Sequence, residues 1–313
     1  MVAAGLFNPI TGKMLTKTWL ADQLYPYLHS FYQQCEVELG HRFYFPTDLY
    51  RPFLTVEEQN DWMAKSEDPS IRPYIKKIYL TPHFSQCHNP FGGMVLNQCG
   101  FLAVDQFMMA VRQRLSAINS FENLHFDPTQ LTVQPDRVGY GNDEAKAIVF
   151  CNGIRQIEMS YFSWLPVRPL MGEVLTIRLA ETPEAIFNRG VYVVPAGPHY
   201  KVGATYRHSP PNEGNTPEGL GELTTKLKDL LAIPYEIIGE GWGIRPTTPD
   251  RKPILGSHFA FKNVITFNGL GTKGVSQAPY FANQLVQWLS GRGEIQPEVN
   301  IERFKALYSK SLV

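Results

Sequence analysis

The 313-residue chain balances 29 Lys and Arg against 29 Asp and Glu, so its formal net charge at pH 7 is zero. This balance argues against a protein that binds nucleic acid or a membrane surface through bulk charge, although it leaves room for a local basic patch. The sequence has no apolar run long enough to span a bilayer and no basic-then-apolar signal peptide. We therefore expect a cytoplasmic protein with no membrane partner.

Cysteine and histidine usage favours neither a disulfide framework nor a metal centre. Cys35, Cys87, Cys99 and Cys151 follow no C-x-x-C spacing, which is typical of reduced thiols. The only candidate metal cluster is His83, Cys87 and His88, and it lacks a fourth ligand. We expect an ordinary polar loop there and no metal.

The first part of the chain alternates helices with proline-rich segments. Apolar residues at three- and four-residue steps predict a helix over 18–39 that a glycine ends, and a second helix over about 103–118. Aromatic and proline residues over 43–54 favour short strands and turns. Thr55 opens a capping box and a short helix, and the loops and short strands of 66–98 would suit an active-site cover.

The second part changes character. Ala147 to Phe150 read as a buried strand that ends in an Asn152-Gly153 turn. Closely spaced strand candidates then favour an antiparallel sheet, and a helix follows in which Thr216 is the N-cap and Pro217 the first residue. The three strand candidates are Glu173–Leu179, Gly190–Ala196 and Tyr200–Thr205.

A strand over Val264–Phe267 runs into the glycine turn Gly269–Gly274, and a helix follows from about Ser276. Backbone N–H groups at such a helix start suit a phosphate, a carboxylate or another electron-rich group. The turn matches G-x-G-x-x-G with Glu294 about twenty residues on, but too little chain follows for a dinucleotide-binding βαβ unit. A contact with another part of a cofactor is the better functional interpretation, and a purely structural turn is the alternative.

Arg245 lies between a flexible Gly-Trp-Gly segment and Pro246. Fixed neighbours would make this arginine a bidentate clamp for a substrate carboxylate. Capping of a carbonyl, or a surface pair with Asp250, is the alternative.

Two ordered C-terminal motifs, G-I-R-P-T-T-P-D-R-K-P-I-L-G and F-N-G-L-G-T-K-G-V-S-Q-A-P-Y, follow V-Y-V-V-P and V-G-A-T-Y. This pattern resembles the FAD-dependent D-amino acid oxidase and glycine oxidase family. The resemblance implies α/β plus α+β architecture, with an incomplete FAD/NAD(P)-binding Rossmann-like domain and an inserted antiparallel-sheet substrate domain. We expect the FAD-binding domain to comprise 1–42, 98–160 and 241–313, and the substrate domain 43–97 and 161–240.

The resemblance also implies the chemistry, which is oxidation of an amine or amino acid by hydride transfer to flavin N5, followed by hydrolysis of the imine. Such transfer needs no strong general base if the amine arrives neutral. Arg245 matches the family's carboxylate-binding arginine, and Tyr192 matches a position near the substrate; an ordinary strand aromatic is the alternative for Tyr192. The small-molecule substrate is an amine or amino acid.

The resemblance places the cofactor contacts in three segments. The turn matches a segment near flavin N1 and the C2 carbonyl, where N–H groups and Lys273 would stabilise the reduced, anionic flavin, although Lys273 could equally be solvated. No cysteine lies within 250–262, so FAD is expected to be non-covalent. The expected cofactor contacts are Ala4, Gly5, Asn152, Gly153, Gly269, Gly271, Thr272, Lys273 and Gly274.

Members of the family open with a strand, a G-x-G-x-x-G turn, a helix and a strand that ends in an acid. Val2 to Lys13 resemble the segment that follows this unit, and the unit itself is absent from the sequence. The reading frame starts late, or the chain is a fragment, or the unit has been lost. We expect the chain as written to bind FAD weakly or not at all.

Two alternatives to the small-molecule oxidase stay open. The same motifs look like the oxidase domain of bifunctional enzymes that act on an aminomethyl uridine in tRNA, which the neutral charge does not favour. A truncated relative that binds a small acid without catalysis is the other.

Overall fold

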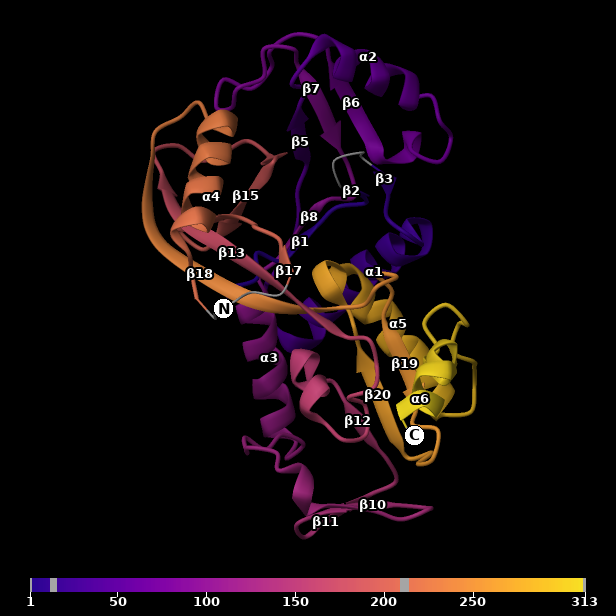
Figure 1. Ribbon diagram of the computed structural model, residues 1–313. Coiled ribbons are helices and arrows are strands. Elements are labelled where there is room, and N and C mark those ends of the chain that lie inside the picture. The colour runs from indigo at the N-terminus through magenta and orange to yellow at the C-terminus, as the bar shows by residue number, and fades with distance from the viewer. Residues whose placement is uncertain (1, 12–15, 209–213, 312–313) are drawn as a thin grey trace. The chain divides into compact units, whose positions relative to one another are not determined.

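The computed structural model describes residues 2–11, 16–208 and 214–311 (Figure 1). The chain forms two compact units. The first comprises Met1–Ile118, Met171–Arg207 and Pro211–Gly243, and the second comprises Asn119–Leu170, His208–Pro210 and Ile244–Val313. The boundaries of these units differ from those of the two domains expected from the resemblance. Residues 1–42 and 98–118, expected in the FAD-binding domain, belong to the unit that contains the antiparallel strands. The FAD-binding and substrate domains are defined by what they bind, so their boundaries remain a prediction.

The helices of the first unit begin and end close to their sequence signals. α1 ends at Gly40, whose left-handed backbone (φ 65°) lets its N–H donate to the Glu36 carbonyl at 2.9 Å. At the start of α2, Thr55 accepts a hydrogen bond from the Glu58 N–H at 3.1 Å. These helices are α1 (Ala21–Leu39), α2 (Val56–Lys65), α3 (Val104–Ala117) and α4 (Pro217–Leu230).

The first unit is built on a nine-stranded sheet with the order β17-β13-β16-β15-β14-β5-β7-β6, in which β18 also pairs with β13. β13, β16, β15 and β14 pair antiparallel in turn, which confirms the predicted antiparallel sheet. β14 and β5 pair parallel. The strands are β5 (Leu49–Pro52), β6 (Ile75–Tyr79), β7 (Gly93–Leu96), β13 (Arg168–Leu179), β14 (Ile186–Arg189), β15 (Val191–Ala196), β16 (His199–Gly203), β17 (Arg207–His208) and β18 (Tyr235–Thr247).

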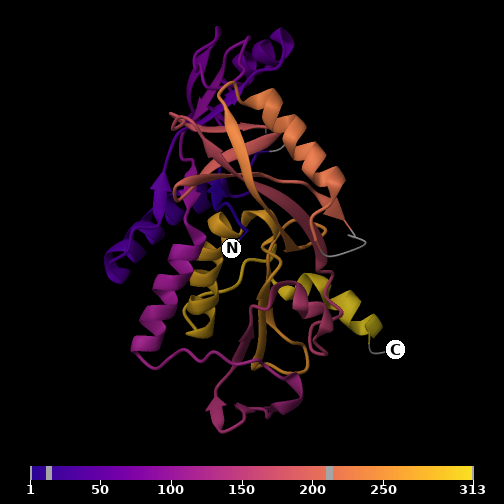
Figure 2. The same ribbon diagram turned by 90° about the vertical axis from the view of Figure 1, so that its left-hand side faces the viewer.

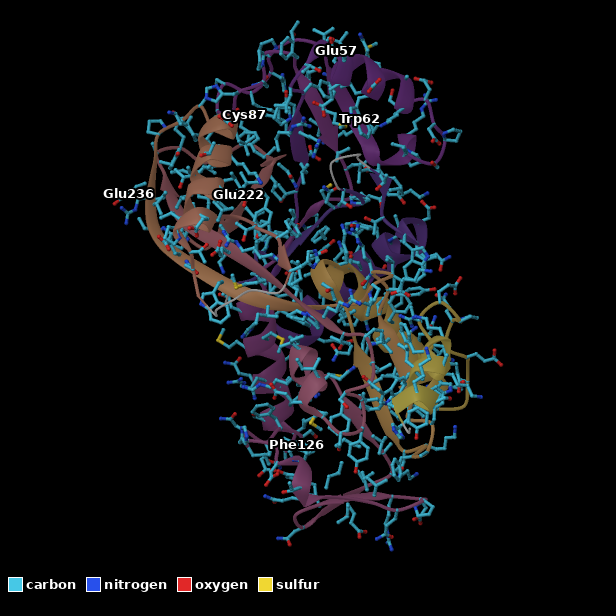
Figure 3. The ribbon with its side chains drawn as sticks, viewed as in Figure 1. Glu57, Trp62, Cys87, Phe126, Glu222 and Glu236 are labelled. Atoms are coloured by element: carbon cyan, nitrogen blue, oxygen red, sulfur yellow. The ribbon has the colours of Figure 1, made fainter. Side chains whose placement is uncertain are left out.

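Helix α4 covers one face of this sheet, as Figure 2 shows. Alternate residues of the strands, among them Leu175, Val193 and Val202, are buried together with Leu223 and Leu227 of the helix. The residues between them therefore belong to the opposite face. In the same unit, α2 buries Trp62, which is 2% exposed (Figure 3).

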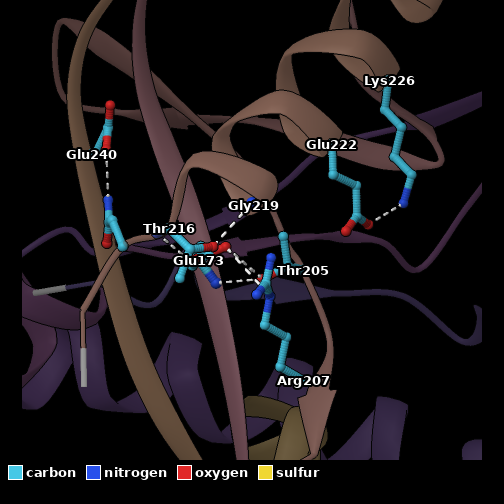
Figure 4. A network of polar contacts seen from close by, with 9 residues as sticks. Glu173, Thr205, Arg207, Thr216, Gly219, Glu222, Lys226 and Glu240 are labelled. Atoms are coloured by element: carbon cyan, nitrogen blue, oxygen red, sulfur yellow. Dashed lines mark hydrogen bonds and ion pairs between the residues drawn. The ribbon is translucent and has the colours of Figure 1, made fainter. Parts of the chain in front are cut away.

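A buried carboxylate joins the start of α4 to the sheet (Figure 4). Glu173 of β13 is 2% exposed and accepts hydrogen bonds from the Thr216 N–H at 2.7 Å and the Thr205 hydroxyl at 3.3 Å. The Thr216 hydroxyl in turn accepts from the Gly219 N–H at 3.0 Å, which confirms Thr216 as the predicted N-cap. The negative carboxylate also complements the positive end of the helix dipole.

Two smaller sheets complete the first unit. One has the order β1-β8-β4, and the other pairs β2 with β3. Their strands are β1 (Leu6–Phe7), β2 (Ile10–Thr11), β3 (Thr16–Lys17), β4 (Tyr44–Pro46) and β8 (Gly100–Leu102).

The second unit contains a three-stranded sheet with the order β12-β20-β19, and α5 lies beside it (Figures 1 and 2). β12 and β20 are parallel, whereas β19 and β20 are antiparallel. A small antiparallel sheet, β11-β10-β9, precedes it in the chain. The elements are β9 (Leu131–Val133), β10 (Val138–Tyr140), β11 (Asp143–Ala145), β12 (Ile148–Phe150), β19 (Ile254–Ser257), β20 (Val264–Asn268), α5 (Gly274–Leu289) and α6 (Lys305–Ser311).

Within the described ranges, every helix is too short or too polar to cross a membrane. All four cysteines lie within the described residues, and none of them forms a disulfide there.

Candidate cofactor and substrate site

Two glycine turns meet at one edge of the β12-β20-β19 sheet. β12 and β20 run parallel in the register Ile148 to Val264 and Phe150 to Thr266, so both strands end at the same edge. Asn152-Gly153 follows β12, and Gly269 to Gly271 follow β20. The carboxyl ends of parallel strands are where open α/β sheets bind their ligands.

Buried amides tie the two turns together. The Asn268 side-chain amide donates to the Gly153 carbonyl at 2.8 Å and to Gln156 Oε1 at 2.6 Å. Gln156 Oε1 also accepts from the Thr266 hydroxyl at 2.9 Å, and the Gln156 residue has no solvent exposure. On its other side Asn268 Oδ1 accepts from the Gly269 N–H at 2.8 Å. This network fixes the backbone of both turns.

The turn after β20 leads through a short 3-10 helix (Gly271–Lys273) directly into α5. Gly269 (φ 74°) and Gly271 (φ 52°) adopt backbone conformations that other residues rarely take. In the described chain, neither Leu270 nor Lys273 caps these helix starts with its side chain. The first N–H groups of α5, at the positive end of its dipole, therefore suit an electron-rich ligand group.

Arg245 lies near the end of β18, so the Gly-Trp-Gly segment before it is part of a strand. The expectation of a flexible segment is wrong, because β18 pairs with β13. The residues that follow Arg245 pack against the glycine turns: a Cβ on Gly271 would lie 3.4 Å from Thr247 Cγ2, and one on Gly153 would lie 3.9 Å from Pro246 Cγ. Arg245 thus lies in a strand, and the two residues that follow it contact the two glycine turns.

The alternative partner of Arg245, Asp250, is engaged elsewhere. Its carboxylate accepts from Arg303 Nε at 3.1 Å, and that arginine is only 17% exposed. The Arg303 guanidinium also donates to the Pro253 carbonyl at 2.9 Å. Asp250 is therefore part of a structural cluster around Arg303.

The remaining predicted residues lie in the first unit. Gly5 (φ 69°) precedes β1. A Cβ at this position would lie 1.9 Å from the Leu102 carbonyl oxygen, so the close approach of the Leu102 backbone is sufficient to require glycine here. Ala4 is half-buried beside it. Tyr192 is half-buried on β15, on the sheet face away from α4. Near His83 and Cys87, the described residues include no group of three metal-ligating side chains.

A sequence profile of the DAO family, described as FAD-dependent oxidoreductases, matches residues 2–288. The chain belongs to this family. Its match to the tRNA 5-methylaminomethyl-2-thiouridine biosynthesis bifunctional protein MnmC of Idiomarina loihiensis has 26% identity and covers 45% of this chain and 25% of that protein. Its match to the bifunctional protein ThiO/ThiG of Trichormus variabilis has 33% identity and covers 40% of this chain and 20% of that protein. These matches thus span a quarter or less of the curated relatives.

Among solved structures, the fold is similar to that of glycine oxidase from Bacillus cereus, with a TM-score of 0.74 and 17% identity. The similarity covers 93% of this chain and 85% of that one. This likeness confirms the expected fold class, in which several sheets combine with helices in a DAO-type arrangement.

The residues at the sheet edge fit the flavin cofactor that the DAO family implies. Three buried side-chain atoms there, Asn152 Oδ1, Gln156 Nε2 and Gln277 Oε1, have no hydrogen-bond partner among the described residues. Buried polar atoms rarely stay unsatisfied in folded proteins, so such atoms indicate a polar ligand or ordered water. A flavin ring offers both donors and acceptors at its edge.

Gln156 and Gln277 were not found from the sequence. Gln156 lies in a 3-10 helix (Gly153–Glu158), and Gln277 lies in the first turn of α5 with 2% exposure. A glutamine in such a segment is usually solvated. In the sequence, the only sign of a role for either glutamine is that it lies a few residues after a glycine turn, and that sign is weak.

Proposed function

We propose that this protein oxidises the C–N bond of a small amine or amino acid with FAD as its redox cofactor. The observation that supports this proposal best is the edge of the β12-β20-β19 sheet in a chain of the DAO family. Two linked glycine turns, the start of α5 and the end of the strand that contains Arg245 come together there. The fold neighbour from Bacillus cereus is a glycine oxidase, which supports the same class of substrate.

The glycine turns would hold the flavin without a covalent bond. When bound, FAD accepts a hydride from the substrate carbon. The N–H groups at the start of α5 would face the electron-rich N1 and C2 carbonyl edge, with Thr272 and Lys273 beside them, because a helix N-terminus stabilises negative charge. Asn152, Gly153, Ala4 and Gly5 are proposed as further cofactor contacts.

Arg245 would bind the substrate carboxylate. A guanidinium keeps its charge at all working pH values and donates two parallel hydrogen bonds to a carboxylate, which fixes both position and orientation. The strand and the turns around Arg245 restrict its backbone, so little freedom is lost on binding. Tyr192 would contact the substrate with its hydroxyl, and the amine would arrive neutral without a dedicated base.

A tRNA substrate is the second candidate, because MnmC, a relative at 26% identity, is a tRNA biosynthesis protein. The net charge of zero does not favour it. A relative that binds a small acid without catalysis is the third.

Purification with added FAD, followed by flavin spectroscopy and assays for ammonia and a carbonyl product across amino acids and amines, tests the proposal. Because the sequence predicts weak FAD binding by this chain alone, the assays keep FAD in excess, and we expect flavin-dependent release of ammonia from at least one small amino acid. No FAD binding and no product, even when the chain is joined to the strand, G-x-G-x-x-G turn and helix with which family members open, would overturn the proposal. Product from an aminomethyl uridine in tRNA, with salt-sensitive binding and none from free amino acids, would favour the second candidate instead.

A further inference from the structure

A pocket lined by aromatic rings lies at the end of β20 that is far from the glycine turns. The His258 N–H donates to the carbonyl of Val264, the first residue of β20, at 2.7 Å, whereas the glycine turn follows the last residue, Asn268. The length of β20 separates these two ends by roughly 13 Å. The pocket has a volume of about 330 Å³, which is in the range of small-molecule sites. It is therefore a different place from the proposed cofactor site.

Three segments of the second unit form the walls of this pocket. One follows the 3-10 helix after β12, another is the turn between β19 and β20, and the last is α6. Serines complete the lining, and none of the described residues in it is acidic. The rings are those of Tyr161, Trp164, His258, Phe261 and Tyr308.

His258 is 5% exposed, and the other rings pack around it. The ring centres of Phe261 and Tyr308 each lie 5.2 Å from that of His258, the first inclined by 26° to it and the second by 87°. Tyr161 lies at 6.1 Å, also nearly perpendicular. Phe261 is nevertheless 40% exposed, so the cluster presents aromatic surface to a ligand. The competing explanation is that these rings only pack α6 against the sheet.

The turn determines which nitrogen of His258 carries the proton. Nδ1 accepts hydrogen bonds from the N–H groups of Ala260 at 3.2 Å and Phe261 at 3.3 Å. Burial and the positive charge of Lys262 lower the pKa of His258, so the ring is mostly neutral at pH 7 and its proton is on Nε2. The described residues give this Nε2–H no acceptor. A buried donor that lines a pocket without an acceptor indicates a polar ligand atom or a water.

We propose that this pocket binds a flat heteroaromatic small molecule, which stacks on the rings and offers a ring nitrogen or a carbonyl oxygen to the Nε2–H of His258. A nucleobase is one member of this class. A cage of aromatic rings can also bind an organic cation, but here the N–H donor and the nearby Lys262 both repel positive charge. The inference does not depend on the proposed function.

The test compares binding of benzimidazole and of indole by ligand-detected NMR titration at pH 8, with FAD in excess to keep the probes out of the cofactor site. The two probes share a two-ring frame, and only benzimidazole has a ring nitrogen that accepts a hydrogen bond. We expect benzimidazole to bind about fivefold more tightly, which corresponds to one neutral hydrogen bond. Equal binding of the two probes, no binding of benzimidazole, or tighter binding of tetramethylammonium would overturn the inference.

Two variants locate the probe in the pocket. His258→Asn keeps an oxygen that can accept from the turn and removes Nε2, so the two probes should then bind equally. Tyr308→Leu removes a stacking ring and should weaken both probes about fivefold. The matched control Phe121→Leu, which removes a ring of the same unit that is 38% exposed and outside the pocket, should change neither.

Circular dichroism shows whether each variant folds, and the comparison of the two probes on the unmodified protein needs no variant. A preference for benzimidazole that persists in His258→Asn, or probe binding that Tyr308→Leu leaves unchanged, would overturn the inference. If the rings only pack α6 against the sheet, Tyr308→Leu lowers stability but neither probe binds the unmodified protein.

Discussion

Gly219 in the first turn of α4 tests how the buried carboxylate of Glu173 holds the helix on the sheet. A Cβ at position 219 would lie 1.3 Å from Glu173 Oε2, so Gly219→Ala must displace the carboxylate. Displacement breaks its hydrogen bonds to the Thr216 N–H and the Thr205 hydroxyl. Each hydrogen bond to a charged group contributes about 1.5–3 kcal/mol. Alanine recovers about 1 kcal/mol in helix propensity, so we expect a net loss of about 3 kcal/mol.

The matched control is Gly221→Ala in the same helix, where no atom lies within 4 Å of the added Cβ. That substitution should stabilise the protein by about 0.5–1 kcal/mol. Both free energies of unfolding come from urea titrations followed by circular dichroism. In a Glu173→Ala background, Gly219→Ala should no longer destabilise. A Gly219→Ala variant as stable as Gly221→Ala, or an equal loss with and without Glu173, would refute the reasoning.

Three further predictions concern single positions. Gln156→Leu leaves the Thr266 hydroxyl and the Asn268 amide without their acceptor and should lower the free energy of unfolding by about 2–4 kcal/mol; a loss below 1 kcal/mol in a urea titration would contradict the network. Gly269→Ala combines a positive φ with a Cβ 2.7 Å from Thr248 Cγ2 and should cost about 1–3 kcal/mol, with weaker FAD retention in a flavin fluorescence titration. Burial raises the pKa of the Cys87 thiol to about 12, so at pH 8 it is almost fully protonated; mass spectrometry after iodoacetamide treatment should find it modified only in urea, and rapid modification in the folded protein would show that the thiol is accessible.

Local signals in the sequence predicted most helices and the antiparallel strands. The Thr216-Pro217 start of α4, the Gly40 end of α1 and the glycine turn before α5 are all encoded within a few residues, and the structure has each of them. The misread segment was Gly241 to Gly243, which looks flexible because glycine favours turns. Its strand conformation comes from pairing with β13, some seventy residues earlier, and such non-local pairing leaves no local signal.

The candidate site was predictable only in part. The glycine turns and Arg245 were identified from spacing and from the family resemblance. The amide network around Gln156 depends on the register of β12 against β20, which brings Asn268 to the Gly153 carbonyl. Glu173 was missed as a buried carboxylate for a similar reason, since a charged residue in a strand is expected to face water.

The role of Arg245 as the carboxylate clamp is the central claim, and anaerobic reduction of bound FAD by an amino acid tests it most directly. Bleaching of the flavin absorbance reports electron transfer from substrate alone. We expect the unmodified protein and the exposed control Arg292→Lys to bleach at the same rate, and Arg245→Lys to bleach about 100-fold more slowly, because lysine cannot hold the carboxylate bidentately. Bleaching of Arg245→Lys at the unmodified rate would contradict the account.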